Sequence, residues 1–187
     1  MPPRFFAPEL TSSSPDVTLP AGESAHLTRV LRLAAGTVVE VFDGRGVLRS
    51  GIVERASPQA SVVRVGAPLS AAPEPDAPIV LAVSLLKGDA MDAVVRDATV
   101  LGACEIWPVR AARSNVPARA AQAAHERWER VTVAAAKQCG RAVLPRLAPV
   151  RPLTDVLADA RADLPVRLWL TEPAAAVGHT AEVPVPP

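Results

Sequence analysis

The chain has 187 residues, of which 49% are hydrophobic and 21% charged, and a formal net charge of +1, so it can bury a core and is not a highly charged, disordered chain. No apolar run approaches the roughly 18 residues of a membrane span, and the first ten residues (MPPRFFAPEL) lack the apolar segment of a secretory signal. Neither the three histidines nor the two cysteines have metal-ligand spacing, an arrangement that suits a reducing cytoplasm, so we expect no metal site and no membrane association.

Residues 1–70 have the pattern of a small, β-rich domain. Three short apolar or β-branched stretches, each bounded by glycine, proline or serine, predict strands: residues 38–42, 47–54 and 61–65. Residues 43–46 (DGRG) predict the tight turn between the first two strands, because glycine and aspartate tolerate a positive φ. We therefore expect a small barrel or curled sheet.

One helix is expected to interrupt these strands, over residues 25–33, with Gly36 as a stop signal. Its apolar residues recur at the spacing of one helical face: Leu27, Val30 and Leu31. Its polar residues occupy the other faces: His26, Arg29 and Arg32.

A proline-rich segment separates this domain from the rest of the chain. Residues 67–78 contain four prolines and no periodicity, which is typical of a semi-rigid linker. We therefore divide the chain into a first domain at residues 1–70, a linker at 71–78 and a second domain at 79–187.

The second domain alternates predicted strands and helices. The expected strands are residues 79–86, 105–109, 143–147 and 166–170, and the expected helices are 89–101, 120–139 and 154–162. Residues 79–86 are almost continuously apolar, as in a strand covered on both faces, and Asp89 stands where an N-cap is wanted. Gly102 and Gly140 follow two of the helices as stop signals. Such alternation predicts a parallel sheet, and the whole chain an α+β protein.

Positive charge is concentrated in the second domain. Residues 110–151 contain nine lysines and arginines but only two glutamates. Such a concentration favours a polyanionic partner such as nucleic acid, although a solvated helix face explains it equally well.

A series of short strings runs in order along nearly the whole chain: residues 26–32 (HLTRVLR), 42–44 (FDG), 86–92 (LKGDAMD), 101–102 (LG), 107–109 (WPV), 113–114 (RS) and 137–141 (KQCGR), followed by Pro145. Together they resemble the bacterial 16S ribosomal RNA uracil-N3 methyltransferases. The resemblance implies a PUA-like RNA-binding barrel followed by a SPOUT-type methyltransferase domain. It also implies S-adenosylmethionine as methyl donor, 16S rRNA or the small ribosomal subunit as partner, and a homodimer.

The chain departs from this family in two respects. The GPEGG-like and LRxETA-like segments, which form the knot and hold the cofactor in the family, do not occur. We therefore expect an incomplete second domain that lacks the knot, and we assign no cofactor-binding residue. In addition, Asp97, Val100 and Lys137 stand where the family tends to have lysine, glutamate and glutamate. Because two of these signs are reversed, we expect Asp97 and Lys137 to form an exchanged ion pair.

The resemblance assigns RNA contacts to six residues: His26, Arg29, Arg32, Lys87, Arg113 and Arg141. Arginine suits this role because its guanidinium binds phosphate in a bidentate way. His26 is as readily a packing residue, and the catalytic base cannot be named. Two alternatives to the enzyme remain, an RNA-binding protein without chemistry and a structural or dimerisation fragment.

Overall fold

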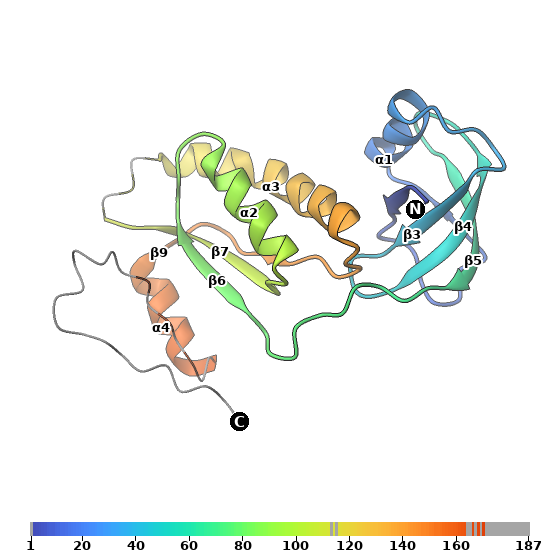
Figure 1. Ribbon diagram of the computed structural model, residues 1–187. Helices are drawn as coiled ribbons and strands as arrows, with labels where there is room; N and C mark the ends of the chain where they lie inside the picture. The colour runs from blue at the N-terminus through green and yellow to red at the C-terminus, as the bar shows by residue number, and fades with distance from the viewer. Residues whose placement is uncertain are drawn as a thin grey trace.

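The structure, a computed structural model, describes residues 2–112, 114, 116–163, 166, 168 and 170. It has two parts that lie side by side, joined by an extended linker (Figure 1). None of the helices it describes is long and apolar enough to cross a membrane.

The first part is a curled, mixed five-stranded sheet. Its strands are β1 (Arg4–Phe6), β2 (Asp16–Thr18), β3 (Val38–Phe42), β4 (Leu48–Arg55) and β5 (Val62–Pro68), in the order β1-β3-β4-β5-β2. β1 runs parallel to β3, and the other pairs are antiparallel. The alternating inward residues form a closed core: Phe5, Leu10, Val17, Val39, Val41, Val53 and Val63. The three strands expected here are confirmed, whereas β1 and β2 had not been expected.

The helical segment of this part differs from the prediction. It begins at α1 (Ala21–Ala25), after Pro20, and continues as a π-helical segment, η1 (His26–Val30). A π-helical turn holds one residue more than an α-helical turn, which rotates the following side chains away from the core. Leu27 is therefore buried, but Val30 and Leu31 are 65% and 40% exposed. The segment ends at Arg32, whose φ of 53° is left-handed, and not at Gly36.

The second part is a parallel sheet with helices, as predicted. Its strands are β6 (Val80–Ser84), β7 (Glu105–Arg110), β8 (Arg146–Leu147) and β9 (Arg151–Pro152), and β7 pairs with the other three. The helices α2 (Ala90–Val100) and α3 (Ala118–Cys139) pack together on one face of this sheet, and α4 (Leu153–Asp163) lies beyond β9 (Figure 1). The strand expected at residues 166–170 falls partly outside the described residues.

The core of the second part lies between the sheet and the α2–α3 pair. It contains Leu85, Met91, Val95, Ile106 and Trp128. The expectation that residues 79–86 are covered on both faces is wrong, because β6 is an edge strand and Ala82 and Ser84 on its other face are exposed. The stop signals at Gly102 and Gly140 are confirmed, with φ values of 94° and 87°.

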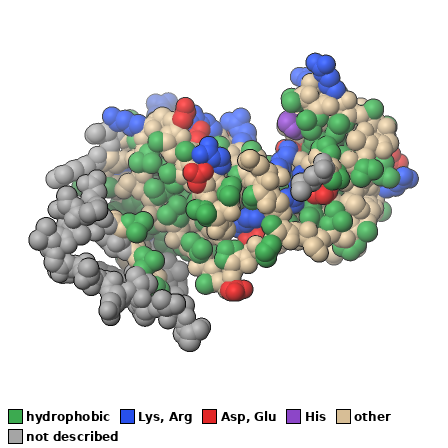
Figure 2. Space-filling view, viewed as in Figure 1, with side chains coloured by type: hydrophobic (Ala, Val, Ile, Leu, Met, Phe, Trp, Pro, Cys, Tyr) green, Lys and Arg blue, Asp and Glu red, His purple; other side chains and the backbone are tan. Residues whose placement is uncertain are grey.

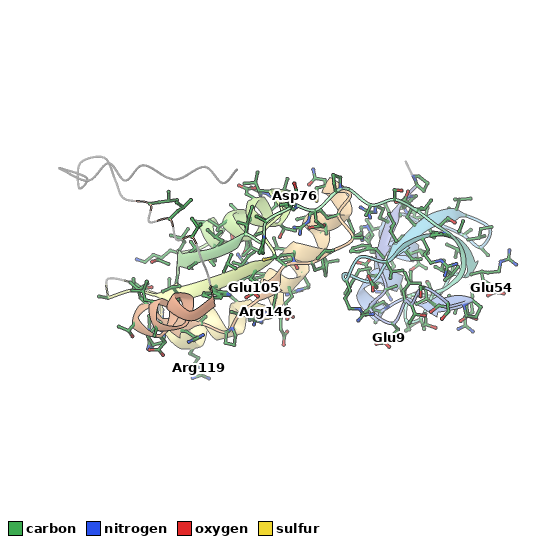
Figure 3. All side chains as sticks on the ribbon, turned by 90° about the horizontal axis from the view of Figure 1, so that it is seen from below. Glu9, Glu54, Asp76, Glu105, Arg119 and Arg146 are labelled. Carbon is green, nitrogen blue, oxygen red and sulfur yellow. The ribbon has the colours of Figure 1, made fainter. Side chains whose placement is uncertain are left out.

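The face of the sheet opposite α2 and α3 is more polar. Here Glu105 accepts a hydrogen bond of 2.7 Å from the Trp107 indole Nε1–H and forms an ion pair with Arg146. Figure 3 shows Glu105 and Arg146 close together below the sheet, with Arg119 extending outward from the start of α3. Glu9 and Glu54 lie at the far end of the first part (Figure 3), so part of the acidic charge is remote from the second part.

The two parts share a small apolar contact. Phe42 and Leu48 of the first sheet pack in one cluster with Ala136 and Ala142 at the end of α3. Ala136 also accepts a hydrogen bond of 3.3 Å from the buried Arg4 side chain of β1. Burial lowers the pKa of the Arg4 guanidinium from its usual value, against the opposing effect of Glu40 at 3.2 Å. The end of α3 is therefore held against the first sheet.

The close pairing of β4 with β5 gives a test of the first core. A Cβ added at Gly51 would lie 2.4 Å from the Val63 side chain, whereas one added at Gly22 would meet nothing within 4 Å. We expect Gly51→Ala to lower the free energy of unfolding by about 1–3 kcal/mol, as for other overpacked cores. Gly22→Ala, the matched control in α1, should leave it unchanged or raise it by up to about 1 kcal/mol. Urea unfolding measures both, and equal values for the two variants would contradict this packing.

Candidate functional site

Arg29 and Arg32 are exposed cations on the helical segment of the first part. Both side chains are open to solvent, and among the described residues neither forms an ion pair. The π-helical turn that exposes Val30 and Leu31 lies between them. Two free cations three residues apart, next to exposed apolar side chains, form a surface that can accept a phosphate backbone.

His26 lies at the start of η1, and its side chain is half-buried. Its ring packs edge-on against Phe5, with the ring centroids 6.4 Å apart and the planes inclined by 63°. The structure therefore gives His26 a packing contact, and its predicted RNA contact remains a prediction.

Lys137 of α3 reaches across to the first part. Its ammonium lies 2.9 Å from Glu23 of α1 and 5.2 Å above the centre of the Phe5 ring. Glu23 also accepts a hydrogen bond of 3.1 Å from the Phe6 backbone N–H. The predicted pair between Asp97 and Lys137 is thus wrong, because Asp97 instead pairs with its neighbour Arg96 at 2.9 Å.

Arg141 does not face solvent. Its side chain is only 4% exposed, and its Nε donates to both carboxylate oxygens of Glu74, at 3.1 and 3.0 Å. Its Nη1 donates to the backbone carbonyls of Thr99 at 2.6 Å and Ala103 at 3.3 Å. The predicted RNA contact of Arg141 is therefore wrong, since every face of the guanidinium is enclosed by the linker and the end of α2.

Lys87 lies at the mouth of a hollow at the carboxyl end of β6. The hollow has a volume of about 400 Å³, and its walls come from the turn after β6, from α2 and from the start of α3: Leu85, Gly88, Met91, Pro117, Ala124 and Trp128. A second hollow of about 340 Å³ shares Leu86, Lys87 and Val116 with it and also includes Ser114. Crevices at the carboxyl ends of parallel strands are common ligand sites. The sixth predicted RNA residue, Arg113, lies outside the described residues.

One wall of this hollow is held by Arg127, which the sequence had not singled out. Its guanidinium donates to Asp92 and, at 3.0 Å, to Asp89, and the hydrogen bond to Asp92 raises the pKa of Arg127 above its usual value. Asp89 stands at the N-cap position of α2 as predicted, but its carboxylate makes no capping hydrogen bond and pairs with Arg127 instead. Helical spacing places Arg127 beside Trp128 on α3, but no sequence signal identifies its partners.

The exposed cations lie along one edge of the molecule. Figure 2 shows lysine and arginine side chains over α3 and over the helical segment of the first part, with a depression between the two parts. Within the part of the chain that the structure describes, no three metal-ligating side chains cluster. The arrangement can therefore bind an extended anion, and its hollow can receive a small group.

Known proteins resemble both parts of the chain. The sequence pattern of the RNA methyltransferase domain family matches residues 73–182, and that of the RNA methyltransferase PUA domain matches residues 19–66. A curated relative, ribosomal RNA small subunit methyltransferase E of Synechocystis sp., is 34% identical over 139 residues, which are 74% of this chain and 44% of that protein. The chain thus spans less than half of the curated relative.

Solved structures agree in fold. Ribosomal RNA small subunit methyltransferase E of Neisseria gonorrhoeae, bound to S-adenosyl methionine, superposes with a TM-score of 0.78 and 27% identity, covering 84% of this chain and 65% of that one. A putative methyltransferase of Legionella pneumophila, in complex with the same cofactor, superposes with a TM-score of 0.81 and 25% identity, covering 88% and 69%. The predicted fold class, a small β domain followed by a parallel α/β domain, is confirmed.

The ion pair between the two parts gives a test of their contact. Lys137 and Glu23 are only 19% and 16% exposed, so their coupling should exceed the roughly 0.2–1 kcal/mol of exposed pairs. We expect a double-mutant cycle with Glu23→Gln and Lys137→Gln to give about 1–2 kcal/mol in the free energy of unfolding. The same cycle with Asp97→Asn in place of Glu23→Gln should give a coupling near zero. Similar couplings in the two cycles would show that the Glu23 contact does not form.

Proposed function

The chain belongs to the RNA methyltransferase family, and on this premise we propose that it acts in the methylation of a uridine at N3 in 16S ribosomal RNA, with S-adenosylmethionine as the donor. The observation that carries the proposal is that both parts match this family, the first its PUA domain and the second its RNA methyltransferase domain. The proposed assembly is a homodimer, which sedimentation of the full chain would test.

The residues of the first part have the properties that RNA binding needs. Arg29 and Arg32 are exposed and free of ion pairs with other described residues. Cations of this kind fix the position of a nucleic acid by neutralising phosphates, with little preference for base. On this proposal the first part holds the strand and the second part receives the nucleotide that is modified.

Methylation at N3 places two demands on the second part. The ring N–H must lose its proton, and the ring must be held in line with the methyl group, so that positioning in a dry pocket supplies much of the rate. The hollow beside Lys87, with its apolar walls of Leu85, Met91 and Trp128, supports such a role.

The same hollow does not fit the methyl donor. S-adenosylmethionine carries a positive sulfonium, whereas the residues that line the two hollows include the cation Lys87 and no acidic side chain. We therefore assign no described residue to the donor and derive no step through it. This lack of fit favours a second candidate, an RNA-binding protein without chemistry.

Methyl transfer separates the two candidates. The full chain is incubated with labelled S-adenosylmethionine and 16S rRNA or small ribosomal subunits that lack the modification. Label in N3-methyluridine supports the enzyme, and RNA binding without label supports the binding protein.

The RNA contacts are tested by Arg29→Gln combined with Arg32→Asn, because asparagine tolerates the left-handed φ at position 32. The double variant should bind a small-subunit rRNA fragment more weakly. Its affinity should also depend less on salt, by about one to two units in the slope of log K against log salt, since each lost phosphate contact removes roughly 0.7–0.9. Filter binding at several salt concentrations measures both.

A matched control replaces two other exposed arginines of the same domain, Arg55 and Arg64, which lie on the strands β4 and β5. Arg55→Gln with Arg64→Gln removes the same charge but should leave the slope nearly unchanged. Equal losses in the two double variants would mean that binding follows net charge alone, and the assignment to the helical segment would fail.

A further inference from the structure

We propose that the hollow at the carboxyl ends of β6 and β7 binds a single pyrimidine nucleotide of the RNA, with its ring against the apolar wall and its phosphate at Lys87. The inference rests on the proposed function and assigns to it a recognition site. It arises from the shape, the wall chemistry and the unpaired polar groups of this hollow.

The hollow has the size and composition of a small-ligand site. Its volume of about 400 Å³ lies within the roughly 300–1,000 Å³ of ligand pockets. Its deep wall is fixed, because Met91 and Trp128 are only 1% and 3% exposed and belong to the core between α2, α3 and the sheet. Rigid apolar walls can accept the faces of a planar ring without rearranging.

Two polar groups at the hollow have no partner among the described residues. The Ser114 hydroxyl, on the loop after β7, is enclosed yet makes no hydrogen bond. A buried hydroxyl without a partner is costly, and an incoming ring with amide-like edges would satisfy it. Lys87, at the mouth shared by both hollows, is exposed and forms no ion pair with the residues that the structure describes.

The charges around the mouth favour one phosphate. Arg127 is occupied by Asp89 and Asp92, so its charge is balanced and it serves as a fixed wall. Lys87 is then the cation left to meet an anion. An apolar slot with one hydroxyl inside and one ammonium at its mouth matches a nucleotide, whose ring has polar edges and whose phosphate carries the charge.

The slot also fits the way in which enzymes reach a base. A base in a stacked strand is inaccessible, so enzymes that modify bases rotate the nucleotide into a pocket. Arg29 and Arg32 on the first part could hold the flanking strand, while the hollow receives the rotated nucleotide. The ring is a pyrimidine because the proposed substrate is uridine.

Binding is tested on the full chain by following the indole N–H of Trp128 and the backbone amides of Lys87 and Gly88 by NMR. Uridine 5′-monophosphate should shift these signals saturably at millimolar concentration, and more tightly than uridine or adenosine 5′-monophosphate. Absence of saturable shifts, or equal affinity for the uridine and adenosine nucleotides, would overturn the proposal.

Two variants locate the site. Lys87→Gln should weaken uridine 5′-monophosphate about tenfold but leave uridine unchanged, because only the phosphate contact is lost. Ala120→Phe adds a ring at an exposed position of α3 that lines the hollow, so it should abolish the shifts for both ligands without disturbing the core. Arg96→Gln, a control on α2 outside both hollows, should change neither. Unchanged binding in Ala120→Phe, with the fold intact by circular dichroism, would place the nucleotide elsewhere.

The proposal and the proposed function can fail separately. Salt-dependent rRNA binding through Arg29 and Arg32 is measured on the same samples and should survive Ala120→Phe. Loss of nucleotide shifts with intact rRNA binding and methyl transfer overturns the slot alone. Nucleotide shifts without methyl transfer to 16S rRNA overturn the enzyme and leave the slot standing.

Discussion

The arrangement of the two parts depends on one buried cation. A guanidinium removed from water must have its donors satisfied, because an unpaired buried charge is strongly destabilising. Arg141 meets this demand with Glu74 of the linker and with the carbonyls of Thr99 and Ala103. The linker is thereby fastened to the end of α2, and Pro75 of the linker packs so closely on Gly102 that an added Cβ would lie 2.5 Å away. A segment that composition marks as a spacer is thus part of the second domain's structure.

Two further cations extend this fastening to the first sheet. Arg4 reaches the carbonyl of Ala136, and Lys137 reaches Glu23, so consecutive residues of α3 both contact the first part. The apolar contact of Phe42 and Leu48 with Ala136 and Ala142 lies beside them. The depression between the two parts therefore has a firm base, and cations on either side of it keep a defined separation.

Local patterns in the sequence predicted the elements that are long or well bounded. The strands β3, β4 and β6, the helices α2, α3 and α4, and the glycine stops follow from spacing and turn chemistry. The strands β1 and β2 did not, because three residues carry too little pattern. The π-helical segment was missed because its apolar residues fit an α-helix equally well, and only the fold decides which of them is buried.

The site shows the same division between local and distant information. Arg29, Arg32 and Lys87 are exposed as their sequence setting indicates. Arg141 was misread because its partners lie 42 and 67 residues away, and Lys137 because Glu23 lies 114 residues away. Arginine next to a helix end looks alike in sequence whether it meets a phosphate or a carbonyl. Only the packing of the linker against α2 distinguishes the two.

The contact between Lys137 and Glu23 constrains how such domains can be exchanged between relatives. In a relative with glutamate at the position of Lys137, as the family resemblance suggests, a glutamate retained at position 23 would place two carboxylates together beside the Phe5 ring. Like charges so close in a half-buried setting repel, and one would have to take up a proton or move. A hybrid that joins the first part of this chain to the second part of such a relative would therefore be impaired at the junction, unless the partner residue on α1 were transplanted with it.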